Sequence, residues 1–193
     1  MNPWTGNLTF LICLIASIAI RIPHDKRSQE TKVVKDRKGA VEKTLLGLVM
    51  AGLVVFPLLS FTPVLSFARY PMHPVAFALG LFTMLLSLWI FHRSHEDLGR
   101  NWSATLEIRE SHALITNGIY QKIRHPMYTS IFLMAIGQAL LLPNWLAGPA
   151  TLFAFTLMFV SRLHTEEQMM LDQFGAEYEA YRQRTKRIIP GIW

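Results

Sequence analysis

The chain has 193 residues, about the length of one domain, and 51% of them are hydrophobic, with a mean hydropathy of +0.28. This composition is too apolar for an ordinary soluble domain and favours a membrane protein. The net charge of +6 does not indicate a nucleic-acid partner, because the basic residues cluster between apolar runs without interleaved aromatic residues. The single cysteine, Cys13, excludes an internal disulfide and a cysteine-based metal site, and we expect it to be a small buried hydrophobic residue.

Three long apolar runs fill the N-terminal half of the chain. The first, residues 4–22, is long enough to span a bilayer, and it is predicted to be a retained helix because its basic residues follow it, unlike those of a signal peptide. The second, residues 44–67, is uncharged, and its Pro57 and Pro63 predict a kink or an early end. The third, residues 75–91, follows a proline. We therefore expect three membrane-spanning helices before residue 93.

Two shorter apolar runs, residues 127–142 and 145–160, follow in the C-terminal half, and Pro143-Asn144 between them predicts a tight turn. As helices they would be about 23–25 Å long, shorter than the roughly 30 Å hydrocarbon core, so they would tilt little, thin the bilayer or barely cross it. The predicted fold class is all-α: a polytopic membrane protein with about five transmembrane helices, a cytosolic loop or hairpin segment and a C-terminal interfacial amphipathic helix.

The distribution of Lys and Arg supports five spans. Eighteen of the nineteen basic residues lie in three segments, 21–43, 93–126 and 162–193, and only Arg69 lies elsewhere. Five alternating spans place these three segments on one side, which the positive-inside rule makes the cytoplasm. Four or six spans would scatter the basic residues over both faces. We therefore predict an N-terminus outside, a cytoplasmic C-terminus and a functional site on the cytoplasmic side.

The polar segment 93–126 is the first candidate for function, because loops held between helices commonly carry it. Alternation in residues 105–108 and the turn residues Asn117-Gly118 predict a small hairpin. At the end of the segment stands Arg124-His125-Pro126-Met127-Tyr128, in which Pro126 suits the first position of a helix. Such a helix N-terminus offers N–H groups to an anion or carboxylate.

A second candidate follows the fifth apolar run. Arg162 and Glu166 are four residues apart and share a helical face, which fits either an interfacial ion pair or a polar site at the membrane boundary. Glu167 is adjacent. Beyond them, apolar and aromatic residues recur at helical spacing and predict an amphipathic helix along the cytoplasmic interface, interrupted at Gly175. We expect this stripe to contact the membrane or the protein core. These residues are Met170, Phe174, Tyr178 and Tyr181.

Five motifs occur in order over roughly residues 95–190. They are L-G-R-N-W (98–102), H-A-L-I-T-N-G-I-Y (112–120), R-H-P-M-Y (124–128), R-L-H-T-E-E (162–167) and F-G-A-E-Y-E-A-Y (174–181). Together they resemble the isoprenylcysteine carboxyl methyltransferase and phospholipid methyltransferase family of membrane enzymes. The first two helices match only in being hydrophobic. We expect a single domain, 1–193, with a three-helix scaffold (1–92) and a cofactor-binding and catalytic part (93–193).

The resemblance implies S-adenosylmethionine-dependent methyl transfer, no metal, and a site unlike the Rossmann type, in agreement with the absence of a G-x-G-x-x-G motif. It implies that Arg162 is a substrate-binding and catalytic arginine. Thr105 stands where some relatives have a glutamine, so one cofactor hydrogen bond is expected to be missing or supplied otherwise. The positions that match cofactor contacts are His112, Ala113, Leu114, Ile115, Tyr120, His125, Pro126, Met127, Tyr128, Glu166 and Glu167.

The acceptor determines which chemistry these residues must perform. A carboxylate is ionised at neutral pH and needs no base, and Arg162 can orient it through paired hydrogen bonds. A lipid amine needs a base, for which Glu166, Glu167 or His125 are the candidates. The favoured function is methylation of a prenylated cysteine or a similar lipid-linked acid that enters from the membrane. The alternatives are N-methylation of an amino phospholipid, a nicotinamide-dependent sterol-type reductase, for which the chain is short, and a non-enzymatic scaffold.

Overall fold

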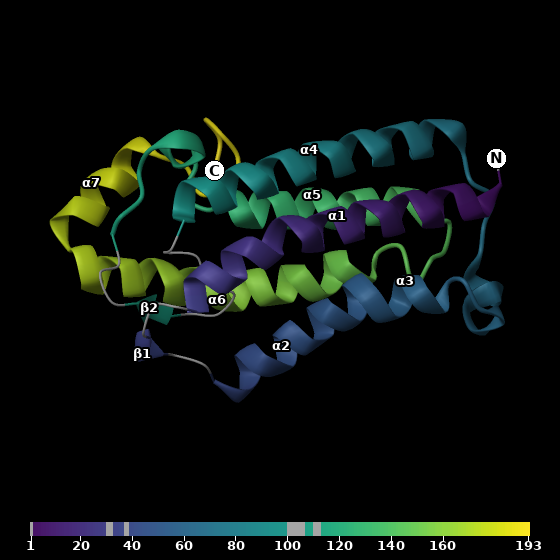
Figure 1. The fold of residues 1–193 in the computed structure, drawn as a ribbon, viewed down its shortest axis with the longest axis horizontal. Helices are drawn as coiled ribbons and strands as arrows, with labels where there is room; N and C mark the ends of the chain where they lie inside the picture. Colours follow the sequence, from purple (N-terminus) through teal and green to yellow (C-terminus); the bar gives the residue numbers. More distant parts are fainter. Residues whose placement is uncertain (1, 30–32, 37–38, 100–106, 110–112) are drawn as a thin grey trace.

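The computed structural model describes residues 2–29, 33–36, 39–99, 107–109 and 113–193, and its helices lie along one long axis (Figure 1). Within these residues, three helical stretches are long and apolar enough to cross a membrane: Trp4–Lys26, Ala40–Leu59 and Pro74–Leu98. A shorter apolar helix, Pro126–Leu141, accompanies them. The chain therefore has the predicted architecture of a helical, polytopic membrane protein, while the count of five spans stays a prediction.

The first helix, α1, comprises Pro3–Gln29 and extends beyond the predicted 4–22. Its polar end remains helical, and Arg21 pairs with Asp25 one turn later at 3.3 Å. One face of α1 is apolar and exposed, as a lipid-facing surface should be, and the other is buried in the bundle. Cys13 lies on the buried face with 6% of its surface exposed, which confirms the prediction for this residue.

The second predicted span is one helical rod with a break in its hydrogen-bond ladder. It passes from α2, Ala40–Met50, through a π-helical turn, Ala51–Val55 (η1), into the short α3, Phe56–Leu59. Pro57 has no N–H to donate, so the regular ladder cannot continue through this region. The rod stops before a 3₁₀ segment, Pro63–Ala68 (η2), and the predicted early end is therefore present.

Gln138 links this rod to the helices beside it. It lies on α5, Pro126–Leu141, and is fully buried. Its amide group donates to the carbonyl oxygens of Gly52 at 3.0 Å and Ala147 at 2.7 Å, and its carbonyl accepts from the Thr151 hydroxyl at 2.7 Å. Backbone carbonyls away from water require such partners. The link fixes η1 against the start of the helix α6, Ala150–Phe174.

The third predicted run, 75–91, is the centre of α4, Pro74–Leu98, which packs along α5 more extensively than any other pair of elements. Small residues permit this close approach. A Cβ atom added at Gly137 would lie 2.6 Å from the side chain of Met84. The α4–α5 pair therefore forms the rigid centre of the bundle, and the polar end of α5 has a fixed position.

Asn144 organises the connection between α5 and α6. Its side-chain oxygen accepts from the N–H groups of residues 146 and 147, both at 3.0 Å, and its amide group donates to the Leu65 carbonyl at 2.8 Å. The predicted turn is present, but the fifth helix does not begin at residue 145. It begins as α6, Ala150–Phe174, because the bonds of Asn144 hold residues 145–149 in a loop.

The predicted hairpin within the polar loop is wrong for the described residues. The strand β2, Glu107–Arg109, pairs in antiparallel register with β1, Val33–Asp36, which follows α1. Tyr120 lies in a 3₁₀ turn, Gly118–Gln121 (η4), and not in a strand. Thr105 lies outside the described residues. The loop is thus tied to the distant segment between α1 and α2.

The C-terminal amphipathic stripe lies on two helices. α6 continues to Phe174, where Gly175 has a φ of +54° and breaks the helix as expected, and α7, Ala176–Arg184, follows. Tyr178 and Tyr181 on α7 are each only 2% exposed. These two residues therefore face the protein interior, so this half of the stripe makes core contact, one of the two kinds of contact that we expected.

The two ends of the molecule differ in charge. Arg69 lies beside Asn144 at the end that holds the N-terminus, whereas β1, β2, α7 and the C-terminal tail gather at the opposite end (Figure 1). The basic residues of these segments are Lys35, Arg109, Arg182, Arg184, Lys186 and Arg187. These six residues lie away from Arg69, as the expected grouping of basic residues implies, while the number of spans and the side of each end stay predictions.

Replacement of Asn144 should destabilise the fold. Asn144→Ala leaves buried backbone groups without partners, and we expect a loss of about 2–3 kcal/mol in the free energy of unfolding. Thermal unfolding in detergent measures this. The matched control, Asn117→Ala, changes an exposed residue and should stay within about 0.5 kcal/mol. Equal stabilities of the two variants would contradict the role of Asn144.

Candidate active site

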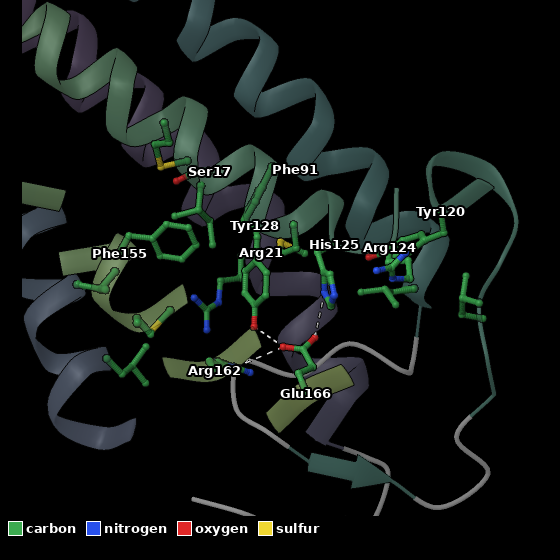
Figure 2. Close-up of a pocket in the computed structure, with 18 of the residues that line it drawn as sticks. Ser17, Arg21, Phe91, Tyr120, Arg124, His125, Tyr128, Phe155, Arg162 and Glu166 are labelled. Atoms are coloured by element: carbon green, nitrogen blue, oxygen red, sulfur yellow. Dashed lines mark hydrogen bonds and ion pairs between the residues drawn. The ribbon is translucent and has the colours of Figure 1, made fainter. Parts of the chain in front are cut away.

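A cavity of about 310 Å³ lies between the helices, and residues from both halves of the chain line it. This volume is at the lower end of the range of small-molecule sites. Most of its surface is apolar and comes from residues 113–115 and from side chains of α1, α2, η1, α4, α5 and α6. Its polar lining, part of which Figure 2 shows, comprises Ser17, Arg21, Tyr120, Arg124, His125, Tyr128, Arg162, Glu166, Tyr178 and Tyr181.

Glu166 is the centre of the polar lining (Figure 2). Its carboxylate accepts a hydrogen bond from the Tyr128 hydroxyl, and it lies 3.7 Å from Nε of Arg162 and 3.6 Å from Nδ1 of His125. Arg162 precedes Glu166 by one turn of α6, and the other two residues lie at the start of α5. The two candidate motifs of the sequence therefore meet at this carboxylate.

Glu166 is ionised in this setting. Burial would raise the pKa of its carboxyl, but the hydrogen bond and charge of His125, the charge of Arg162 and the Tyr128 hydroxyl outweigh burial and lower the pKa to about 2. The side chain keeps 30% of its surface exposed. A carboxylate that is ionised and accessible can accept hydrogen bonds from a ligand or attract a cation.

His125 lies between two carboxylates. Its Nδ1 faces Glu166 at 3.6 Å, its Nε2 faces Glu167 at 3.5 Å, and its ring stacks on Tyr128 with 5.4 Å between centroids. Burial alone would lower the pKa of the imidazole, but the hydrogen bonds and charges of the two glutamates raise it. The protonated ring can thus donate to both carboxylates at once.

Glu167 faces away from the cavity and joins two segments of the chain. It accepts from Arg124 at 2.7 Å and from Arg187 at 3.2 Å, and its side chain is 7% exposed. Burial would raise the pKa of its carboxyl, but His125 and these two arginines hold it well below its usual range. Arg124 also donates to the Thr185 carbonyl at 2.6 Å. In this structure Glu167 anchors the C-terminal tail and lies outside the cavity lining.

Arg162 lines the cavity and is 9% exposed. Besides Glu166 it contacts Glu42 of α2, with 3.6 Å between Nη1 and Oε1. Glu42 was not among the candidate residues predicted from the sequence. One signal was present, because Glu42 is the only acidic residue between Asp36 and Glu96 and precedes a long apolar run. A charge in this place requires a partner.

Arg21 of α1 also lines the cavity, although the sequence assigned it only to a basic loop. Its pair with Asp25 is about 40% exposed on both sides and therefore contributes little to stability. Arg21 and the apolar residues of α2 show that the cavity is not confined to the predicted catalytic part, 93–193.

The remaining predicted positions that the structure describes lie in or next to the cavity. Ala113, Leu114, Ile115, Tyr120 and Met127 line it, whereas Pro126 begins α5 and His112 lies outside the described residues.

A tight turn at Gly118, with a φ of +59°, holds this segment. The N–H of Ile119 donates to Asp97 at 2.8 Å, and the Tyr120 carbonyl accepts from the Tyr181 hydroxyl at 2.7 Å. These bonds join the segment to α4 and α7, so both helices determine the position of Tyr120 in the cavity wall.

Comparison with known proteins agrees with the motifs of the site. A sequence model of the isoprenylcysteine carboxyl methyltransferase family matches residues 76–172. The protein-S-isoprenylcysteine O-methyltransferase of Schizosaccharomyces pombe is 29% identical over 143 residues, which is 69% of this chain and 60% of that protein. The enzyme of the same name from Tribolium castaneum is 36% identical over 96 residues, 49% of this chain and 34% of that protein.

A solved structure is also similar. It is that of the eukaryotic intramembrane Ras methyltransferase, an isoprenylcysteine carboxyl methyltransferase, with a TM-score of 0.56 and 28% identity. The match covers 81% of this chain and 55% of the other. The chain thus spans between 34% and 60% of the length of these relatives.

The pH dependence of stability should report the charge on His125. Because its pKa is raised on folding, the imidazolium stabilises the folded state fully below its unfolded pKa of about 6.5, and this contribution is lost as the pH rises through the folded pKa. The stability advantage of wild type over His125→Asn should therefore be constant below about pH 6 and shrink as the pH rises above about 6.5. Thermal unfolding in detergent across this range measures it.

Glu166→Gln supplies the control, because it removes one of the two carboxylates that favour the imidazolium. When His125→Asn is introduced into the Glu166→Gln variant, the resulting loss of stability should therefore depend less on pH than it does in wild type. A difference between wild type and His125→Asn that is constant with pH would contradict the assignment.

Proposed function

Because the chain belongs to the isoprenylcysteine carboxyl methyltransferase family, we propose that it transfers a methyl group from S-adenosylmethionine to the carboxylate of a lipophilic acceptor such as a prenylated cysteine. The observation that carries this proposal is the composition of the cavity. Its polar end brings Glu166, His125 and Arg162 together, and its remaining surface is mostly apolar. Such a cavity suits one polar ligand and one acceptor with an apolar tail.

The residues around Glu166 fit S-adenosylmethionine. The bound cofactor would supply an electrophilic methyl group on a positively charged sulfur. The exposed part of the Glu166 carboxylate can accept hydrogen bonds from hydroxyl or ammonium groups. Apolar side chains of residues 113–115 and Met127 offer surface to a flat aromatic base. These groups belong to the segments that the family motifs identified, which supports the assignment.

Arg162 is the group that we assign to the acceptor. Its guanidinium lines the cavity at the boundary between the polar lining and the apolar surface of α2. A planar guanidinium orients a carboxylate through two parallel hydrogen bonds. Because Glu42 and Glu166 already share its charge, Arg162 would orient the acceptor without quenching its nucleophilicity. Positioning of this kind can supply a large part of the rate of a displacement reaction.

The protonation states of the site favour a carboxylate acceptor over an amine. An amine must lose a proton, and the candidate bases were Glu166, Glu167 and His125. Both glutamates have lowered pKa values and are weak bases, whereas the raised pKa of His125 favours its protonated form. None of the three is therefore well suited to accept a proton at neutral pH, and a carboxylate has no such requirement.

We also propose that the cavity opens towards the cytoplasm, with the N-terminus outside and the C-terminus cytoplasmic. The basic end of the molecule, which holds α7 and the polar lining, supports this orientation through the positive-inside rule. A water-soluble cofactor would then enter from the cytoplasm, and the acceptor would enter from the surrounding membrane lipid.

Cofactor binding should depend on Glu166 and not on Arg162. In calorimetric titrations with S-adenosylhomocysteine, we expect Glu166→Gln to weaken binding by about tenfold or more, because it removes a charged hydrogen-bond acceptor. Arg162→Ala should change this affinity little. The matched control, Glu96→Gln, alters a surface carboxylate paired with Arg93 and should have no effect. No binding by folded wild type would overturn the proposal.

Methyl transfer should be selective for a carboxylate acceptor. With radiolabelled S-adenosylmethionine, we expect N-acetyl-S-farnesylcysteine to be methylated and phosphatidylethanolamine not. Arg162→Ala should lower kcat/KM for the acid by about 100-fold or more, since paired charge-assisted hydrogen bonds are lost, and Arg162→Lys should restore only part of it. Preferential methylation of the amine lipid would instead establish the N-methyltransferase alternative.

A further inference from the structure

Glu42 places a carboxylate of the protein on the arginine that we assign to the acceptor. Its Oε1 lies 3.6 Å from Nη1 of Arg162, and the two side chains are only 11% and 9% exposed. Because both groups are largely withdrawn from water, their attraction is screened less than that of a surface pair. Arg162 therefore has a resident anionic partner from a helix that carries none of the family motifs.

Glu42 lies on α2 at one end of a row of apolar residues that line the cavity and could contact the tail of the acceptor. Leu46, Val49, Met50 and Leu53 line the cavity at helical spacing from Glu42. An acceptor with an apolar tail along this stripe would therefore have its polar head near Glu42 and Arg162. The head group and Glu42 would approach the same guanidinium.

The carboxylates around Arg162 weaken the binding of an anionic acceptor. Glu42 and Glu166 lie within 3.7 Å of one guanidinium, so a bound carboxylate is the third that approaches it. Like charges this close repel, most strongly where water is excluded. A neutral ester of the same shape does not experience this repulsion.

We propose that Glu42 is a specificity-determining residue that competes with the acceptor carboxylate for Arg162. This inference rests on the proposed function. When the acid binds, the charge of Arg162 must be divided between the acid and Glu42. When the acid has become a neutral ester, Glu42 no longer competes with a second anion for this charge. Glu42 thus limits the affinity for the acid and favours departure of the product.

The test compares the acid with its ester. Binding of N-acetyl-S-farnesylcysteine and of its methyl ester is measured by calorimetry, with S-adenosylhomocysteine present, for wild type and Glu42→Gln. We expect Glu42→Gln to bind the acid about fivefold more tightly or better and the ester with unchanged affinity. In turnover, KM for the acid should fall and kcat should not rise.

A purely structural ion pair between α2 and α6 gives a different result. Glu42→Gln would then weaken acid and ester together, or leave both unchanged, and either outcome would overturn the inference. Glu42→Asp keeps the charge on a shorter side chain and should lie between wild type and Glu42→Gln, which keeps the test decisive if Glu42→Gln folds poorly. Glu96→Gln is the surface control and should bind both compounds like wild type.

The two proposals fail in distinguishable ways. Wild type that binds neither S-adenosylhomocysteine nor the acid overturns the proposed function, and this inference with it. Wild type that binds and methylates the acid, with no selective gain in acid affinity in Glu42→Gln, overturns this inference alone.

Discussion

The site depends on one imidazole that bridges two adjacent carboxylates, of which Glu167 is buried and Glu166 lines the cavity. Successive residues of a helix point about 100° apart, so Glu166 and Glu167 face different sides of α6. The two nitrogens of His125 reach one carboxylate each. Buried carboxylates are costly unless they are paired, and here the cations of His125, Arg124 and Arg162 supply the pairs. The ligand-facing carboxylate is thereby coupled to the one that anchors the tail.

This coupling explains how a cavity at the end of a helical bundle can be rigid. Between membrane-embedded helices the apolar driving force is weak, so packing of small residues and polar links must fix their positions. Gln138 and the close α4–α5 contact do so in the bundle. At the basic end, Glu167 joins α6 to Arg124 and to Arg187 of the tail. The N-terminus of α5 therefore cannot move independently of the tail that covers it.

The sequence predicted the parts of this site that lie in local motifs. His125, Tyr128, Arg162 and Glu166 converge because the motifs mark the ends of two neighbouring helices. Glu42 could not be predicted in the same way, since its contact depends on how α2 packs against α6, and no local pattern encodes that packing. The hairpin failed for a related reason, because β2 pairs with a strand more than 70 residues earlier in the chain.

The charge balance of the site suits the reaction that we propose. Transfer of a methyl group from a sulfonium to a carboxylate joins a cation and an anion and leaves two neutral groups. Surroundings of low polarity, such as the apolar wall of the cavity, raise the free energy of the charged reactants more than that of the neutral products. Glu166 can attract the cation and Arg162 the anion only before transfer. Both attractions weaken afterwards, so the groups that gather the reactants also let the products leave.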